Sequence, residues 1–157
     1  MKILAIDPAT ICGVADSNGL RRIWNLNAMA PPGHEGARHL ALARKLREVL
    51  IDGHYDLLVV EKAAFGAIGQ LKTAAFHSSL AGVIVCVAAE LQVPVWWANP
   101  SEIKKFATGF GNAKKEDMIT AAKRAGELIR DDNVADAYWV LKWAEKEVRI
   151  KKLCKTK

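Results

Sequence analysis

Short runs of hydrophobic residues predict five β-strands, at residues 2–7, 11–16, 20–26, 56–61 and 94–98. The first and fourth runs are continuously apolar and each ends on an acid, Asp7 in one and Glu61 in the other. Such runs are typical of parallel strands that are covered on both faces. An Asn-Gly pair at Asn18 separates the second and third runs and signals a hairpin. We therefore expect the first three strands to form an antiparallel meander.

Apolar residues at helical spacing predict five helices. The first two span residues 35–53 and residues 71 to about 92. The third begins at Asn99, the fourth includes Met118 and Ala122, and the fifth begins at Asp131. The first of these carries its predicted apolar face on Leu40, Ala43, Leu46, Val49 and Leu50. The segments 28–36 and 63–70 are predicted loops.

The second predicted helix carries a stripe of small side chains at steps of three and four: Ala75, Ser79, Gly82, Cys86 and Ala89. Small side chains allow another backbone to approach closely. Our first interpretation of this stripe is packing of the helix on the sheet. The alternative is a contact with another subunit.

The length of 157 residues suits one domain, which we place at residues 1–150, followed by a basic tail at 151–157. A formal net charge of +6 favours a polyanionic partner. Three cysteines without metal-ligand spacing indicate neither a disulfide framework nor a zinc site. Because no apolar run is long enough to span a bilayer, we expect no membrane partner and a cytoplasmic location.

Acids at the ends of two strands and at the start of the last helix are the candidate catalytic groups. Parallel strands bring their last residues, here Asp7 and Glu61, to the same edge of a sheet. On the last helix, Asp136 follows Asp132 by four residues and Asn133 by three, so these side chains share one face. If this helix begins near that edge, the acids converge.

Clustered carboxylates repel one another unless cations neutralise them, and their hard oxygens favour Mg²⁺ or Mn²⁺ over zinc. Two such ions about 3.5 to 4 Å apart would activate a water and stabilise the leaving oxygen of a phosphodiester. The acids therefore indicate hydrolysis of a nucleic-acid backbone.

Four ordered motifs resemble the RuvC-type Holliday junction resolvases: Ile3–Pro8 with Gly13, Leu58–Lys62, Gly109–Lys115 and Asp132–Ala137. Together they cover nearly the whole chain, and its length resembles that of phage or prophage members. The resemblance implies an α/β, RNase H-like fold: a five-stranded mixed sheet, antiparallel in its first three strands and parallel in the later ones, flanked by helices. It also implies a homodimer that nicks four-way DNA junctions symmetrically with Mg²⁺.

By position, Asp7 and Glu61 match the first two catalytic acids of the family and Asp136 matches the last. The bacterial pattern has an acid where this chain has Asn133, so the fourth metal ligand is either Asn133 or its neighbour Asp132.

Several DNA contacts also follow from the resemblance or from charge. Lys115 matches the lysine after the glycine-rich turn of the family, where it would hold the scissile phosphate, with Lys114 as the alternative. Phe65 lies where the family has an aromatic wedge that enters the junction. Lys104 and Lys105 are interpreted as phosphate contacts, as are other basic sets: Arg38, Arg44, Lys45, Arg47, Lys151, Lys152, Lys155 and Lys157.

Four alternatives stay open at this point. In the first two alternatives the reaction is the same but the substrate differs: one is a replication fork or flap in place of a junction, and the other is RNA. A non-catalytic branched-DNA-binding protein would explain Asn133 in place of an acid. An actin-like phosphotransferase also opens with a strand, an Asp and a Thr-containing turn, but it needs two lobes, and 157 residues provide one.

Overall fold

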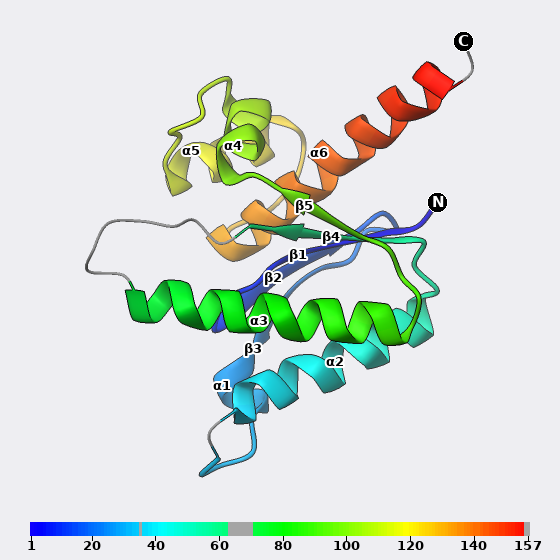
Figure 1. The fold of residues 1–157 in the computed structure, drawn as a ribbon. Helices are drawn as coiled ribbons and strands as arrows, with labels where there is room; N and C mark the ends of the chain where they lie inside the picture. Colours follow the sequence, from blue (N-terminus) through cyan, green and yellow to red (C-terminus); the bar gives the residue numbers. More distant parts are fainter. Residues whose placement is uncertain (35, 63–70, 156–157) are drawn as a thin grey trace.

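A five-stranded sheet with helices on both faces makes up the fold in the computed structural model, which describes residues 1–34, 36–62 and 71–155 (Figure 1). Its strands are β1 (Ile3–Asp7), β2 (Ile11–Asp16), β3 (Arg21–Asn25), β4 (Leu57–Glu61) and β5 (Val95–Ala98). They are ordered β3-β2-β1-β4-β5, with β1–β2 and β2–β3 antiparallel and β1–β4 and β4–β5 parallel. The predicted mixed sheet and its antiparallel meander are confirmed.

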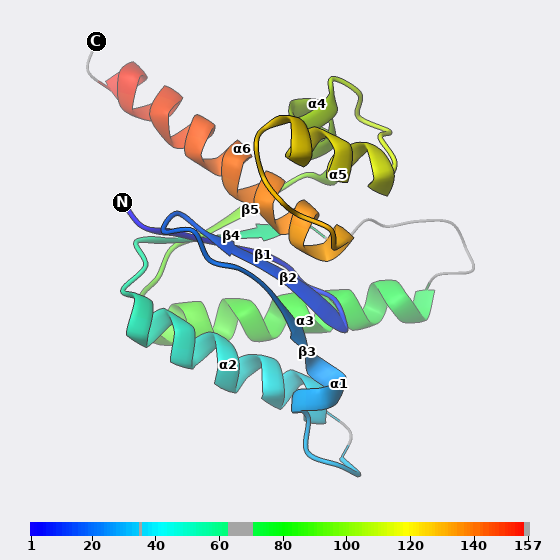
Figure 2. The ribbon, with the colours of Figure 1, turned by 180° about the vertical axis from the view of Figure 1, so that it is seen from behind.

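Two layers of helices cover the sheet, and the views from both sides agree on this (Figures 1 and 2). One layer contains α2 (Ala37–Gly53) and α3 (Leu71–Glu90), and the other contains α6 (Asp132–Lys155). Two shorter helices, α4 (Pro100–Thr108) and α5 (Lys115–Arg124), pack on α6. None of the helices within the described ranges has both the length and the apolar character that crossing a membrane requires.

Side chains of β1 alternate between the two cores. Ile3 and Ala5 point to the α6 side, whereas Leu4 and Ile6 point to the side of α2 and α3. All four are buried, as the continuous apolar run predicts for a strand covered on both faces. The strand therefore delivers Asp7 to the edge of a fully covered sheet.

A buried carboxylate organises the β2–β3 hairpin. Asp16 is only 5% exposed, and its Oδ1 accepts hydrogen bonds from the backbone N–H groups of Asn18 and Leu20. Its Oδ2 accepts a 2.6 Å hydrogen bond from the Tyr55 hydroxyl, which ties the hairpin to the segment before β4. These hydrogen bonds hold the pKa of Asp16 below its usual value in spite of burial.

Three sequence predictions need correction. Residues 26–29, partly within the predicted loop, form the short helix α1 (Leu26–Met29), because Asn25 Oδ1 caps it by accepting from the N–H groups of Asn27 and Ala28. The basic tail expected from residue 151 is not separate from the domain at its start, because α6 continues to Lys155. On α2, Leu40 is exposed, and the buried face is Ala37, Ala41, Leu42, Leu46 and Leu50.

The stripe of small residues on α3 does not pack on the sheet. Ala75, Ser79, Gly82, Cys86 and Ala89 are all exposed. The buried face of α3 is instead formed by Leu80, Ile84, Val87 and Ala88. Larger aliphatic side chains remove more apolar area from water, so they determine which face of the helix meets the core. Our first interpretation of the stripe was therefore wrong.

Candidate active site

Parallel pairing of β1 with β4 brings two acids to one edge of the sheet. Ile6 pairs with Val60 in the register, so Asp7 and Glu61 end neighbouring strands at the same level. Pro8 follows Asp7 directly, and it has no N–H group with which to continue the sheet hydrogen bonding. Both strands therefore end where their carboxylates stand.

Gly13 allows the start of α6 to reach this edge. It is paired with Asp7 across β1 and β2, and a Cβ atom on Gly13 would lie 1.8 Å from the backbone O of Asn133. The backbone of the first turn of α6 therefore rests directly on β2 beside Asp7, which brings Asp132 and Asp136 to the acids of the strands. A glycine inside a strand signals such a close backbone approach, and this signal, besides the place of Gly13 in the family pattern, is visible in the sequence.

A small cleft of about 100 Å³ lies at this edge, with residues from four elements in its wall: Glu61, Pro100, Ile103, Lys104, Lys115, Met118 and Asp136. Lys104 comes from α4 and Lys115 from the first turn of α5, so two cations face two carboxylates. Ile103 and Met118 are buried and form the apolar part of the wall.

The three acids nearest this cleft have raised pKa values. Burial raises the pKa of Asp7 most, and the neighbouring Asp136 adds to it. Burial, followed by the charges of Asp7 and Asp136, raises the pKa of Glu61. Burial is also the main cause that raises the pKa of Asp136 to about 6. Within the described ranges no donor forms a hydrogen bond with any of these three carboxylates, so only the positive charges of Lys104 and Lys115 offset part of the cost of burying them.

Asp132 differs from these three acids, because it forms an ion pair with Lys115. This hydrogen bond lowers the pKa of Asp132 and raises the pKa of Lys115. The Asn133 side chain turns to another neighbour, since its Nδ2 donates to Asp131 Oδ1 at 3.3 Å. Neither Asp132 nor Asn133 is in the wall of the cleft that Glu61 and Asp136 share.

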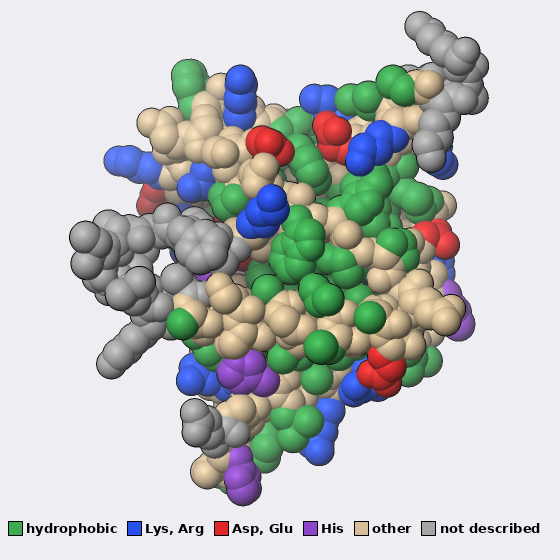
Figure 3. Space-filling model, viewed as in Figure 1, with side chains coloured by type: hydrophobic (Ala, Val, Ile, Leu, Met, Phe, Trp, Pro, Cys, Tyr) green, Lys and Arg blue, Asp and Glu red, His purple; other side chains and the backbone are tan. Residues whose placement is uncertain are grey.

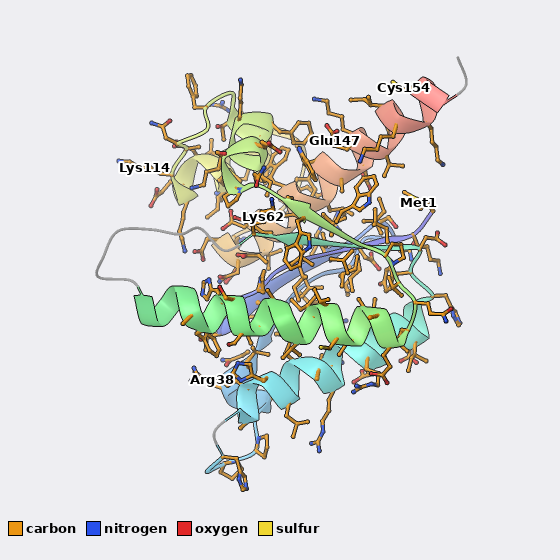
Figure 4. All side chains as sticks on the ribbon, in the orientation of Figure 1. Met1, Arg38, Lys62, Lys114, Glu147 and Cys154 are labelled. Carbon is orange, nitrogen blue, oxygen red and sulfur yellow. The ribbon has the colours of Figure 1, made fainter. Side chains whose placement is uncertain are left out.

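Two of the other predicted DNA contacts, Lys114 and Lys105, lie at the N-cap of α5 and on α4, the helices that contribute other residues to the cleft wall. Lys114 is exposed at the start of α5, where its backbone N–H donates to Asp117 Oδ2 at 2.9 Å, and Figure 4 shows it at the upper left, beyond Lys62, which follows β4 near the centre of the view. Lys105 is exposed on α4 and does not line the cleft. Phe65 lies outside the described residues.

The acids have the chemistry of a site for hard divalent ions, although the side chains are not arranged as a complete one. Asp7, Glu61 and Asp136 are crowded, accept no hydrogen bond from any described residue and repel one another, and a cation would relieve this repulsion. Among the residues that the structure describes, no three Asp, Glu, His or Cys side chains are placed to hold one ion. The donor set thus fits Mg²⁺ or Mn²⁺, and rotation of side chains would have to complete the coordination.

Comparison with known proteins gives close relatives in sequence. No family model matches the chain. A crossover junction endodeoxyribonuclease RuvC from Carboxydothermus hydrogenoformans is 34% identical over 145 residues, covering 87% of this chain and 90% of that protein. The RuvC of Moorella thermoacetica is 33% identical over 146 residues, covering 87% of this chain and 86% of that protein.

Solved structures share the fold. A RuvC structure from Thermus thermophilus matches with a TM-score of 0.71 at 23% identity, over 90% of this chain and 91% of that one. T. thermophilus RuvC in complex with a Holliday junction substrate matches with a TM-score of 0.74 at 22% identity, over 90% of each chain. The yeast mitochondrial Holliday junction resolvase Ydc2 matches with a TM-score of 0.61 at 10% identity, over 98% of this chain and 85% of that one.

The level of identity and the nearly full coverage of these relatives confirm the resemblance drawn from the four motifs. The chain belongs to the RuvC family of crossover junction endodeoxyribonucleases.

Proposed function

We propose that this chain is an endonuclease that uses Mg²⁺ to cut four-way DNA junctions. One observation carries the proposal: Asp7, Glu61 and Asp136 gather at one sheet edge, where no described residue donates a hydrogen bond to them, and Glu61 and Asp136 line a cleft with Lys104 and Lys115. Family membership supports the reaction class, and the named substrate of the T. thermophilus complex supports the junction.

Asp7, Glu61 and Asp136 are the residues that would hold the divalent ions. Bound there, the ions would activate a water and stabilise the leaving oxygen of the phosphodiester. Asn133 offers a carbonyl oxygen beside them, and Asp132 offers a carboxylate that is already paired with Lys115. We therefore propose that Asp132 serves as the ion-pair partner of Lys115. The fourth metal ligand would then be Asn133, after rotation of its side chain.

Lys115 and Lys104 would bind the scissile phosphate. Both line the cleft that contains Glu61 and Asp136, so a phosphate placed there would meet cations as well as the acids. A fixed cation at this position stabilises negative charge that develops on the phosphate oxygens during cleavage. Asp132 keeps Lys115 at the cleft through their ion pair.

Cleavage of labelled branched DNA with and without Mg²⁺ tests the proposed function. The panel contains a four-way junction, a fork, a flap, a linear duplex and an RNA–DNA hybrid. We expect Mg²⁺-dependent symmetrical nicks in the junction and none in the linear duplex. Salt-sensitive binding without any cleavage would indicate the non-catalytic alternative instead, and preferential cutting of the hybrid would indicate an RNA nuclease.

The exposed face of α3 supports a homodimer. Its small residues Ala75, Ser79, Gly82, Cys86 and Ala89 leave the helix backbone accessible, and Val85 beside them is 43% exposed. Figure 3 shows hydrophobic side chains gathered over α3 and the neighbouring β5, with few charges among them. In a two-fold symmetric dimer the same patch of each subunit contacts its own copy. The α3 helices of the two subunits would then pack closely against each other through this face.

Gly82→Arg is expected to prevent dimer formation while the monomer stays folded. Nothing lies within 4 Å of a Cβ atom built on Gly82, and glycine is a poor helix former, so the monomer accepts the side chain. Two like charges meeting at a symmetric interface should raise the dimer dissociation constant about 100-fold or more. Light scattering after size exclusion measures this. Ile51→Arg, at an exposed position of α2, is the matched control and should leave the dimer intact.

A further inference from the structure

Phe110 stands in solvent close to the candidate active site. Its side chain is 70% exposed, and no other Phe, Tyr or Trp side chain in the described ranges is largely exposed. It lies in the connection between α4 and α5, five residues before Lys115. A large aromatic ring held in water has an apolar surface that a ligand can cover.

The backbone under Phe110 is held in place. Its N–H donates to Thr108 Oγ1 at 3.2 Å, and this hydroxyl lies 2.9 Å from the Lys104 carbonyl O. Gly109 has a φ of 89°, which turns the chain sharply at the end of α4, and a Cβ atom on Gly111 would lie 3.3 Å from the backbone O of Ser101. The ring is therefore presented by a fixed turn, which lowers the entropy cost of binding a ligand.

A hollow of about 330 Å³ lies beside the ring and is lined by Ala107, Thr108, Phe110, Asp117, Thr120, Ala121 and Arg124. The hollow and the catalytic cleft lie on opposite faces of α5: Lys115 and Met118 face the cleft, whereas Asp117, Thr120 and Arg124 face the hollow. Its size is at the lower end of the range of about 300–1,000 Å³ that is typical of small-ligand sites.

The polar groups of the hollow include both donors and acceptors. Arg124 forms no ion pair with any residue that the structure describes, so its N–H groups are available. Asp117 uses Oδ2 to accept from Lys114 N–H, which leaves Oδ1 as an acceptor, and Thr120 adds a hydroxyl. An aromatic face beside mixed donors and acceptors matches a nucleobase, which stacks through its face and forms hydrogen bonds through its edge. A bare phosphate fits less well, because the negative charge of the Asp117 carboxylate would repel it.

We infer that Phe110 and this hollow bind an unpaired nucleobase of the DNA strand that enters the catalytic cleft. The inference rests on the proposed function, because a base becomes unpaired when the branch point of a bound junction is opened. Lys115 would bind the backbone on one side of α5, and Phe110 would hold a base of the same DNA on the other side. This makes Phe110 a determinant of selectivity for branched over linear duplex DNA.

The experiment compares wild type, Phe110→Ala, Phe110→Trp and Leu128→Ala in a chelator, so that DNA is bound but not cut. Leu128 is 96% exposed and serves as the matched control for the loss of an exposed apolar side chain. The first probe is a labelled four-way junction, with affinity measured by fluorescence anisotropy. The second probe is the same junction carrying 5-bromodeoxyuridine at single positions around the branch, with photo-crosslinks located by mass spectrometry.

Phe110→Ala should weaken junction binding about 5- to 150-fold and leave linear duplex binding unchanged, because base stacking is lost. Phe110→Trp and Leu128→Ala should bind as wild type does, and the crosslink should fall on Phe110 in the wild type. Equal junction affinity of Phe110→Ala and wild type, or a crosslink elsewhere, overturns the inference while wild-type cleavage with Mg²⁺ still supports the proposed function. If the wild-type protein neither binds junctions in preference to linear duplex nor cuts them, both the inference and the proposed function are overturned.

Discussion

Asp7→Asn, Glu61→Gln and Asp136→Asn are each expected to slow cleavage of a four-way junction by about 10³-fold or more, since each would remove a charged ligand of the proposed divalent ions. The amides keep the shape of the side chains, so the fold is preserved. Junction binding should stay intact or become tighter, because a charge that repels the phosphate is gone. Single-turnover cleavage with Mg²⁺ and binding in a chelator measure the two effects separately.

Glu116→Gln is the matched control for these variants, since Glu116 is an exposed acid in the first turn of α5, next to Lys115. It should cut at the wild-type rate. Full activity in any one of the three acid variants would remove that residue from the site. A parallel loss of binding and melting temperature would show that the acid supports the fold rather than the reaction.

Gly13→Ala is expected to lower both the stability and the activity. Its Cβ atom would lie 1.8 Å from the O and 2.5 Å from the C of Asn133, and both are backbone atoms that cannot rotate away. Either β2 or the first turn of α6 must shift, at a cost of about 1–3 kcal/mol or more in the free energy of unfolding. Because this turn positions Asp132 and Asp136 beside Asp7, cleavage should fall even at temperatures where the variant stays folded.

Chemical denaturation and single-turnover cleavage check this expectation. Gly82→Ala provides the control for the denaturation measurement, because its new Cβ contacts nothing within the monomer and alanine favours helix by about 1 kcal/mol over glycine. Unchanged stability in Gly13→Ala would contradict the close contact between β2 and α6. Reduced stability with an unchanged cleavage rate at low temperature would show that the position of α6 does not limit the reaction.

The sequence alone determined the sheet and the two strand acids. Continuous apolar runs ending in Asp7 and Glu61, and the Asn-Gly turn, are local signals that burial on both faces and hairpin geometry impose directly. The periodicity of α3 correctly indicated a helix, but it misassigned the face. Small and large residues recur at similar spacing there, and competition for buried area decides between them only when the sheet is present.

Only the tertiary structure decided which partners the polar side chains at this edge of the sheet have. Sequence spacing left Asp132 and Asn133 as equal candidates for one ligand position. Packing of α5 against α6 places Lys115 against Asp132, and the Asn133 side chain turns to Asp131. The exposure of Phe110 likewise depends on how the turn after α4 is held by Thr108. Such contacts join residues from separate elements, so no local pattern encodes them, whereas burial and hydrogen bonding in the folded chain select them.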